Sequence, residues 1–453
     1  MSTSIEEQEC GATVLRRPAE DRPPRNWQSF LIGRPLATAD AAHEAIGKFI
    51  GLAVFSSDAM SSVAYAPQEM MLILAMAGTA AFSFAVPIAL AIVLLLTILT
   101  FSYRQTIHAY PGGGGAYIVA RDNLGEIPAL VAGSALLLDY VLTVSVSISS
   151  GVAQLVSAEP SLTQFKVPIA IAMVLFIMLI NLRGVKEAGA IFAVPTYFFL
   201  ATMYLTVGVG LFRALTGALG SVVDPPALEV IGQAQAVSVF LILRAFAGGT
   251  SALTGVEAIS NGITAFKEPR SRNAGVTLIW MAFILGSLML GITYLAVHIG
   301  AIPSEAETVI SQLARTALGD RGPMYLMVIG STTLILVMAA NTAFADFPRL
   351  GALTAADGFL PRQFAYKGSR LVYSSGIMAL AFIACLLIVL FQASVSALIP
   401  LYAIGVFLSF TLSQTGMSRR WWKIGHLAPD QEVKERGSTL RYEKGWQSKM
   451  LVN

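Results

Sequence analysis

Three carboxylic acids, Asp58, Asp139 and Glu257, lie inside long apolar stretches of this sequence. A charged side chain at the centre of a membrane helix costs about 2.5–3.5 kcal/mol on insertion scales, so three acids without polar partners would cost roughly 7–10 kcal/mol. Acids in such positions are expected to face the protein interior, where they bind a cation or hold a proton. The alternative is that they snorkel to the interface or pair with a base. Arg244 lies in an apolar stretch and is expected to be a structural partner or an outer-gate charge rather than a ligand.

Hydroxyl side chains accompany these acids at helical spacing, at Tyr65, Tyr140, Thr143, Ser147 and Thr254. Three of them, Tyr140, Thr143 and Ser147, share one face of a helix. Hydroxyl, carboxylate and carbonyl oxygens are what an alkali cation needs to replace its hydration shell, so the pattern favours a cation site. The alternative is that each hydroxyl bonds to its own backbone or to a neighbouring helix.

Two interrupted apolar segments must position these residues. The stretches 51–67 and 248–262 both combine glycines with hydroxyl side chains, and the first ends at Pro67. Such residues lower the cost of unwinding a helical turn, which frees backbone carbonyls and half-helix ends to hold an ion. The two stretches stand first in each half of the chain, which predicts an inverted repeat of residues 46–213 and 236–417. Paired broken helices of this kind are typical of a secondary transporter.

The surrounding segments predict an all-α polytopic membrane protein. Only 13% of the 453 residues are charged and 55% are apolar or aromatic, which excludes a soluble globular protein. The sequence predicts ten membrane helices, at residues 48–76, 80–103, 127–156, 167–182, 190–212, 236–262, 275–300, 323–345, 375–392 and 395–416.

The distribution of basic residues predicts the topology. Lys and Arg are more frequent in the loops that would share a side with the arginine-rich residues 1–45. The positive-inside rule then makes residues 1–45 and 418–453 cytoplasmic tails on either side of a core at 46–417, in the inner (plasma) membrane. The second tail ends in a stretch that resembles the approach to another membrane segment, so it is either a truncated product or an ordinary frayed tail.

Other functional classes have little support in the sequence. The 30 basic and 27 acidic residues nearly cancel, which gives no reason to expect a nucleic-acid partner. Neither the two cysteines nor the four histidines form a metal-binding motif, and no catalytic constellation is visible, so an enzyme is not predicted. The glycine-rich stretch 111–117 lacks the ending of a phosphate-binding loop and instead predicts a close backbone crossing. A channel would need a repeated filter sequence, which is absent.

Six motifs in this order resemble those of the KimA-type potassium importers of the amino acid–polyamine–organocation (APC) superfamily. They are Phe55–Tyr65, Pro111–Tyr117, Leu138–Gly151, Asn181–Val185, Ser251–Gly262 and Ile399–Gly405. The resemblance runs from about residue 45 to residue 420 and covers all ten predicted helices.

The resemblance implies a LeuT-type fold of two inverted five-helix repeats that imports potassium, with protons as the driving ion and no cofactor. It implies that the cation ligands are Asp58, Tyr65, Tyr140, Thr143, Ser147, Thr254, Glu257 and Tyr402. Tyr402 is implied by the resemblance alone. Asp58, Glu257 and Asp139 are the candidates for carrying the coupled proton.

The resemblance differs at the C-terminus. Members of this group continue into two more membrane helices and a regulatory domain that binds cyclic di-AMP, whereas this sequence stops at Asn453. Regulation, activity and formation of a homodimer therefore stay open. The alternative function is an amino acid or polyamine permease of the same fold, but Asp58 in the first interruption would repel a substrate carboxylate.

Overall fold

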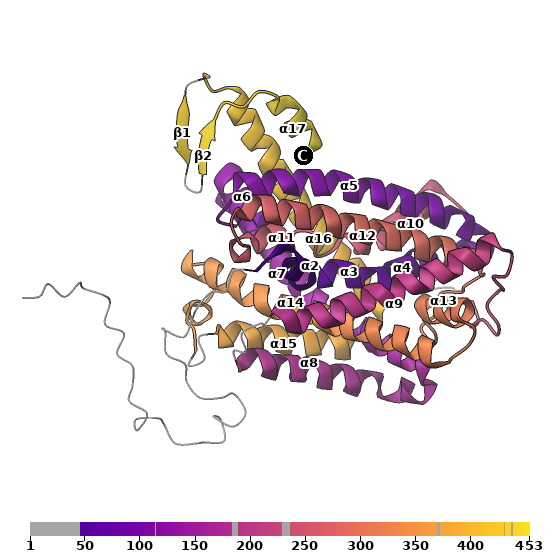
Figure 1. The fold of residues 1–453 in the computed structure, drawn as a ribbon. Coiled ribbons are helices and arrows are strands. Elements are labelled where there is room, and N and C mark those ends of the chain that lie inside the picture. Colours follow the sequence, from indigo (N-terminus) through magenta and orange to yellow (C-terminus); the bar gives the residue numbers. More distant parts are fainter. Residues whose placement is uncertain are drawn as a thin grey trace, which may run out of the picture.

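A computed structural model describes residues 46–113, 115–183, 189–228, 236–368, 372–429, 431–435 and 438–453. The predicted N-terminal tail, residues 1–45, lies outside the described residues. The structure is a bundle of long helices, with a short hairpin and a final helix outside it, above α5 in the view of Figure 1.

The spans agree with the ten predicted segments. Within the described residues, eight helices are long and apolar enough to cross a membrane, and a bent pair at the start of the chain makes a ninth. The remaining predicted segment, 375–392, coincides with the shorter apolar helix α15, whose 17 residues give a length of about 26 Å. The unbroken spans are α5 (Ala85–Ala109), α7 (Glu126–Ala158), α8 (Lys166–Leu182), α9 (Gly189–Leu215), α12 (Arg270–His298), α14 (Pro323–Ala356), α15 (Ser374–Leu390) and α16 (Val395–Gly425).

The first span is interrupted where glycine, serine and proline predicted a break. Helix α2 (Lys48–Phe55) stops at Ser56, and the chain bends by 57° into α3 (Ser57–Ser61). The span continues through η3 (Ser62–Ala64), α4 (Ala66–Leu74) and η4 (Ala75–Ala77). Pro67 stands in the first turn of α4, where its missing N–H costs no hydrogen bond.

The sixth span is interrupted in the same way. Helix α10 (Val239–Gly249) tightens into η7 (Thr250–Leu253), and then the backbone becomes extended at Thr254 and left-handed at Gly255. Helical structure resumes in α11 (Ala258–Asn261) and η8 (Ile263–Ala265). The predicted all-α fold of the LeuT type, with broken first and sixth helices, is confirmed.

Shorter elements connect the spans and cap the bundle. They are η5 (Thr79–Phe84), α6 (Ala116–Asn123), η6 (Pro160–Phe165), α13 (Val309–Leu318), η9 (Arg362–Ala365), β1 (Glu432–Glu435), β2 (Ser438–Arg441) and α17 (Trp446–Val452). The antiparallel hairpin of β1 and β2 and helix α17 lie beyond the bundle at the end of α16 (Figure 1). The glycine-rich stretch is a close crossing, as predicted, because a Cβ on Gly115 would lie 2.8 Å from the side-chain oxygen of Asn261.

Two helices extend beyond their predicted ends. Helix α14 continues to Ala356 and α16 to Gly425, whereas the apolar segments end at residues 345 and 416. The extensions are more polar, so they lower the mean hydropathy without breaking the helix. The long helix α7 packs against both α14 and α16, and these three helices line one side of the broken spans.

Candidate functional site

The Asp58 carboxylate lies where the two broken spans meet. Asp58 is 6% exposed, and a Cβ on Gly255 would lie 2.6 Å from its Oδ2 atom. Gly255 has φ of 75°, a conformation that favours glycine, so the sixth span can pass this close to the carboxylate. The carboxylate therefore faces the unwound backbone of the opposite repeat.

Hydroxyl groups join the two breaks to each other. The Ser62 hydroxyl donates to the carbonyls of Ala59 at 2.6 Å and Ala252 at 3.0 Å. The Tyr65 hydroxyl is 3.5 Å from Thr254 Oγ1, which itself donates to the carbonyl of Ser251 at 2.9 Å. Tyr65 and Thr254 are both buried. Two predicted ligands from opposite repeats are thus brought together beside the breaks.

A second pair of predicted ligands links α7 to α16. Thr143 Oγ1 and the Tyr402 hydroxyl are 2.9 Å apart, and both side chains are buried. The Tyr402 hydroxyl is close enough to Asp58, Tyr65 and Asp139 to interact electrostatically with each of them. Tyr402 therefore connects the hydroxyl face of α7 with the first break.

Glu257 and Tyr140 lie in a neighbouring polar region of the same interior. Oε2 of Glu257 accepts hydrogen bonds from the Tyr103 hydroxyl at 3.2 Å and the Ser409 hydroxyl at 3.4 Å. Tyr140 is half-buried, and its hydroxyl accepts a hydrogen bond from the Asn261 amide at 3.2 Å. The Glu257 carboxyl, on the sixth span, is thereby held between α5 and α16.

Several oxygens in this interior are buried without a hydrogen-bond partner. They are Asp58 Oδ1, Asp139 Oδ1, Ser147 Oγ and Glu257 Oε1. A buried polar atom without a partner costs about 1–3 kcal/mol, so these oxygens are chemically suited to hold a cation or a proton. In the part of the chain that the structure describes, no cluster of three His, Cys, Asp or Glu residues could hold a metal ion. The oxygens that lie around Asp58 and Glu257 belong to carboxylates, hydroxyls and carbonyls, a mixture that suits a monovalent cation.

The family model for amino acid permeases matches residues 47–433, which include both broken spans and every predicted site residue. This chain belongs to the amino acid permease family. The chain is 48% identical over 426 residues to the potassium transporter KimA of Bacillus subtilis, a match that covers 94% of this chain and 67% of that protein.

More distant relatives match part of this chain. The low affinity potassium transport system protein Kup of Pectobacterium carotovorum is 30% identical over 170 residues, covering 36% of this chain and 25% of that protein. Kup of Sodalis glossinidius is 26% identical over 308 residues, covering 65% of this chain and 46% of that protein. Among solved structures, the manganese transporter of Eremococcus coleocola aligns with a TM-score of 0.42 at 12% identity, covering 89% of this chain and 84% of that one.

The structure adds residues that sequence reasoning had not selected. Tyr103 and Ser409 hold Glu257, and their only sequence signal was a polar group within an apolar helix. Asp346 of α14 is close enough to Asp58 and Glu257 to interact with both electrostatically. It also pairs with Arg349 at 3.6 Å, and its side chain is 15% exposed.

Glu69 is buried, although it lies near the outer end of the first span, where an acid is usually solvated. Its side chain is 4% exposed. Its Oε1 atom accepts a hydrogen bond from the Ser396 hydroxyl at 3.0 Å. The physical reason is that α10 and α16 cover this face of α4, which a hydropathy pattern does not reveal.

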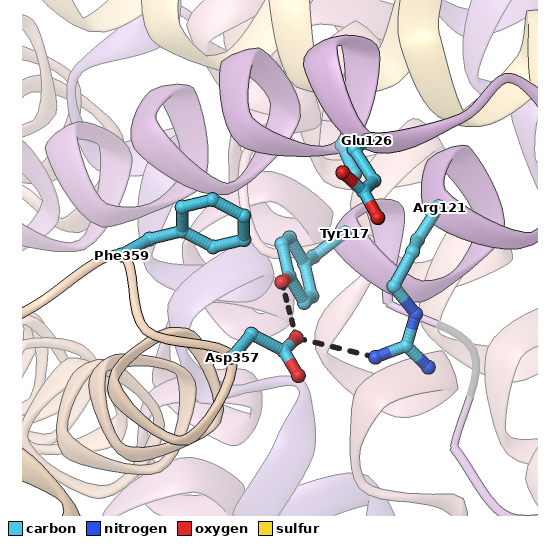
Figure 2. Close-up of a pocket in the computed structure, with 6 residues that line it drawn as sticks. Tyr117, Arg121, Glu126, Asp357 and Phe359 are labelled. Atoms are coloured by element: carbon cyan, nitrogen blue, oxygen red, sulfur yellow. Dashed lines mark hydrogen bonds and ion pairs between the residues drawn. The ribbon is translucent and has the colours of Figure 1, made fainter.

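A separate polar pocket of about 400 Å³ lies between α6, the start of α7 and the segment after α14 (Figure 2). The Tyr117 hydroxyl donates to Asp357 at 2.5 Å, and Arg121 pairs with the same carboxylate at 3.3 Å. Burial, followed by the hydrogen bond to Asp357, raises the pKa of Tyr117 to about 12. Asp357 follows Asp346 by eleven residues of helix, or roughly 16 Å, so this pocket is distinct from the acids of the broken spans.

Proposed function

We propose that this chain imports potassium across the plasma membrane by alternating access, in symport with protons. The observation that supports the proposal best is the buried Asp58 carboxylate, which faces the left-handed turn at Gly255. The neighbouring break carries the Thr254 hydroxyl, which lies 3.5 Å from that of Tyr65. A negative group at the meeting point of two unwound helices attracts a cation, and the surrounding oxygens replace its hydration shell.

In this proposal, oxygens from both repeats coordinate potassium as the transported substrate. The coordinating residues are Asp58, Tyr65, Tyr140, Thr143, Ser147, Thr254, Glu257 and Tyr402. The coupled proton is carried by Glu257 or Asp58, with Asp139 as the third candidate. Proton uptake neutralises a buried carboxylate, which lowers the cost of closing the site around it.

The relatives support potassium as the substrate. KimA is named a potassium transporter, and the Kup proteins are named low affinity potassium transport system proteins. The match to KimA extends over 94% of this chain and includes both broken spans. Because it covers 67% of KimA, the activity of the whole relative comes to this chain only as a proposal.

An amino acid or polyamine permease is the second candidate, favoured by the description of the matching family. An amino acid permease must bind a substrate carboxylate on the backbone N–H groups of the first break. Two carboxylates about 4 Å apart at an effective dielectric constant of about 20 repel by about 4 kcal/mol, or nearly a thousandfold in affinity. Asp58 therefore argues against an amino acid, whereas a polyamine would meet no such repulsion.

The proposal also covers the orientation of the chain in the membrane and its binding partners. We propose that both termini are cytoplasmic, that the protein has no enzymatic activity or cofactor, and that nucleic acid is not a partner. A homodimer is compatible with the family resemblance.

Growth on limiting potassium tests the proposal. A bacterial strain without its own potassium uptake systems expresses either this chain or its Asp58→Asn variant, and the amount of each protein in the membrane is measured. We expect rescue by the parent chain alone. Rescue by both would remove Asp58 from the site, and failure of both, together with failure of a C-terminally extended chain, would contradict potassium import.

A further inference from the structure

The glycine-rich crossing between α5 and α6 reaches the proposed ion site through one side chain, that of Asn261. Asn261 is the last residue of the sixth span, and a Cβ on Gly115 would lie 2.8 Å from its Oδ1 atom. The other end of the same amide, Nδ2, donates to the Tyr140 hydroxyl at 3.2 Å. The Asn261 amide therefore lies between the backbone of the crossing and a predicted ligand on α7.

Two positions in this crossing require glycine for different reasons. Gly113 has φ of 104°, a conformation that favours glycine, and a Cβ there would lie 3.5 Å from the carbonyl oxygen of Asn261. Gly115 has φ of −55° and ψ of 157°, which other residues adopt freely, so only space requires glycine at this position. The three atoms nearest to a Cβ at Gly115 all belong to the Asn261 side chain. The crossing thus limits where this amide can lie.

Packing, rather than a hydrogen bond, fixes the oxygen end of the amide. Within the described part of the chain, Oδ1 of Asn261 is buried and has no hydrogen-bond partner. The Asn261 N–H donates to the carbonyl of Glu257 at 3.0 Å, which holds the backbone of this residue. Contact with Gly115 is therefore what keeps the amide turned with its nitrogen towards Tyr140.

Helix α6 holds the crossing against the amide. The helix begins directly after Gly115 and packs against α7 and α16. Its Tyr117 hydroxyl donates to Asp357 at the end of α14, which fixes α6 to a third helix (Figure 2). Because α6 is held on these sides, the end of the Asn261 side chain is the part that must move when the space beside Gly115 is filled.

The hydrogen bond from Asn261 determines what the Tyr140 oxygen can offer to an ion. A phenol oxygen carries one proton and also accepts hydrogen bonds, and the Asn261 amide occupies one accepting position. The proton and the remaining lone pair of the oxygen then point away from Asn261. The Tyr140 hydroxyl is close enough to Glu257 and Asp139 to interact with both electrostatically, so it belongs to the interior that an ion would enter.

We infer that Asn261 is a positioning residue of the proposed ion site and that the glycine-rich crossing fixes it in place. The inference rests on the proposed function, because Tyr140 is an ion ligand only in that proposal. Asn261 acts without touching the ion: its amide orients the Tyr140 hydroxyl, and Gly115 orients the amide. The crossing thereby acts on ion binding, although it contributes no ligand.

A substitution at Gly115 tests this inference without changing a proposed ligand. The backbone at Gly115 accepts alanine, so Gly115→Ala acts by displacing the Asn261 amide. Gly112→Ala is the matched control in the same crossing, because a Cβ at Gly112 meets no atom of the described residues within 4 Å. Asn261→Ala removes the amide, and the double variant with Gly115→Ala completes a double-mutant cycle.

Potassium affinity is measured by isothermal titration calorimetry on the purified full chain in detergent. We expect Gly115→Ala and Asn261→Ala each to bind potassium about three- to tenfold more weakly than the parent, the loss expected when one hydrogen-bonding group is no longer held in place. Gly112→Ala should bind like the parent. The double variant should bind as Asn261→Ala does, because the three side-chain atoms nearest to the added methyl group are then absent.

A second cycle tests whether Asn261 acts through Tyr140. Tyr140→Phe removes the hydroxyl that accepts from Asn261 but keeps the ring. Asn261→Ala added to Tyr140→Phe should cause no further loss of affinity, because the amide then has no hydroxyl to orient. A merely structural role of Asn261 would lower the affinity equally in both backgrounds.

Equal potassium affinities of Gly115→Ala and Gly112→Ala would overturn the inference, as would additive losses in either cycle. A melting temperature of ion-free Gly115→Ala below that of Gly112→Ala would also overturn it, because the methyl group would then damage the fold rather than turn one amide. Failure of the proposed function gives a different result: the parent chain itself would show no heat of potassium binding, and both proposals would then fall.

Discussion

Replacement of Gly255 by alanine tests whether the Asp58 carboxylate is part of the cation site. Gly255 belongs to no predicted ligand set and contributes no side-chain oxygen. Its φ of 75° and its closeness to Asp58 are the features that a Cβ would disturb. A change at Gly255 therefore moves the carboxylate without altering its charge.

The magnitude follows from the backbone conformation and the contacts. An L-residue in the left-handed region costs about 1–2 kcal/mol. The added Cβ would lie 2.6 Å from Asp58 Oδ2 and 2.8 Å from the backbone nitrogen of Ala59, whereas ordinary contacts begin at 3.4 Å. The carboxylate must then move by about 0.8 Å and the Ala59 backbone by about 0.6 Å, in a close-packed interior that resists both shifts.

In the free Gly255→Ala protein, Asp58 moves away from the added Cβ and the strain is relieved. To bind the cation, Asp58 must return to its original place, and the strain then lowers the binding free energy. A cost of about 1–2 kcal/mol weakens binding about five- to thirtyfold. Potassium affinity is measured by isothermal titration calorimetry on the purified protein in detergent. Gly330→Ala is the matched control, because a Cβ at Gly330 in α14 meets no atom within 4 Å.

We expect Gly255→Ala to bind potassium at least about fivefold more weakly than Gly330→Ala, with both proteins eluting as folded species. Equal affinities in the two variants would refute the reasoning, because they would show that the position of the Asp58 carboxylate does not matter to the bound ion. A loss of affinity in Gly330→Ala of the same size would point to a general effect of alanine in these helices.

Four further predictions follow. Asp58→Asn should abolish potassium uptake in liposomes without lowering thermal stability, because a neutral amide is cheaper to bury than a carboxylate. Glu257→Gln should make potassium flux insensitive to pH. The initial rate of potassium uptake, measured from about pH 5.5 to about pH 8, should then stay constant. Tyr402→Phe should weaken potassium binding about fivefold, as expected for one hydrogen-bonding group worth about 1 kcal/mol, in the same calorimetric assay. Tyr117 has a pKa of about 12 in the folded protein and 10.0 in the unfolded chain. Its contribution to stability is therefore complete below pH 10.0 and is lost as the pH rises towards 12. Over that range, the difference in melting temperature between the parent and Tyr117→Phe should shrink.

The breaks in the first and sixth spans were predictable from the sequence because their causes are local. Gly51, Ser56 and Pro67 act on their own helical turns, and long apolar runs between them leave little choice but a membrane helix. The face shared by Thr143 and Ser147 was predictable for the same reason, since helical periodicity fixes which side chains lie together.

Contacts between distant segments were less predictable. The approach of Gly255 to Asp58 and the hydrogen bonds that Tyr103 and Ser409 make to Glu257 depend on how separate helices pack, which periodicity does not encode. Burial of Glu69 is not predictable for the same reason, because Ser396, which donates a hydrogen bond to it, lies 327 positions away. Tyr402 was found through family resemblance alone, since an aromatic residue in an apolar helix is usually a packing residue.

Potassium uptake into liposomes that contain the purified chain tests the central claim most directly. The internal and external potassium concentrations start equal, the membrane potential is clamped, and an inward proton gradient is the sole driving force. We predict that the parent chain accumulates potassium above the external concentration and that Asp58→Asn does not. Accumulation by both proteins, or potassium movement by the parent that ignores the proton gradient, would contradict the account.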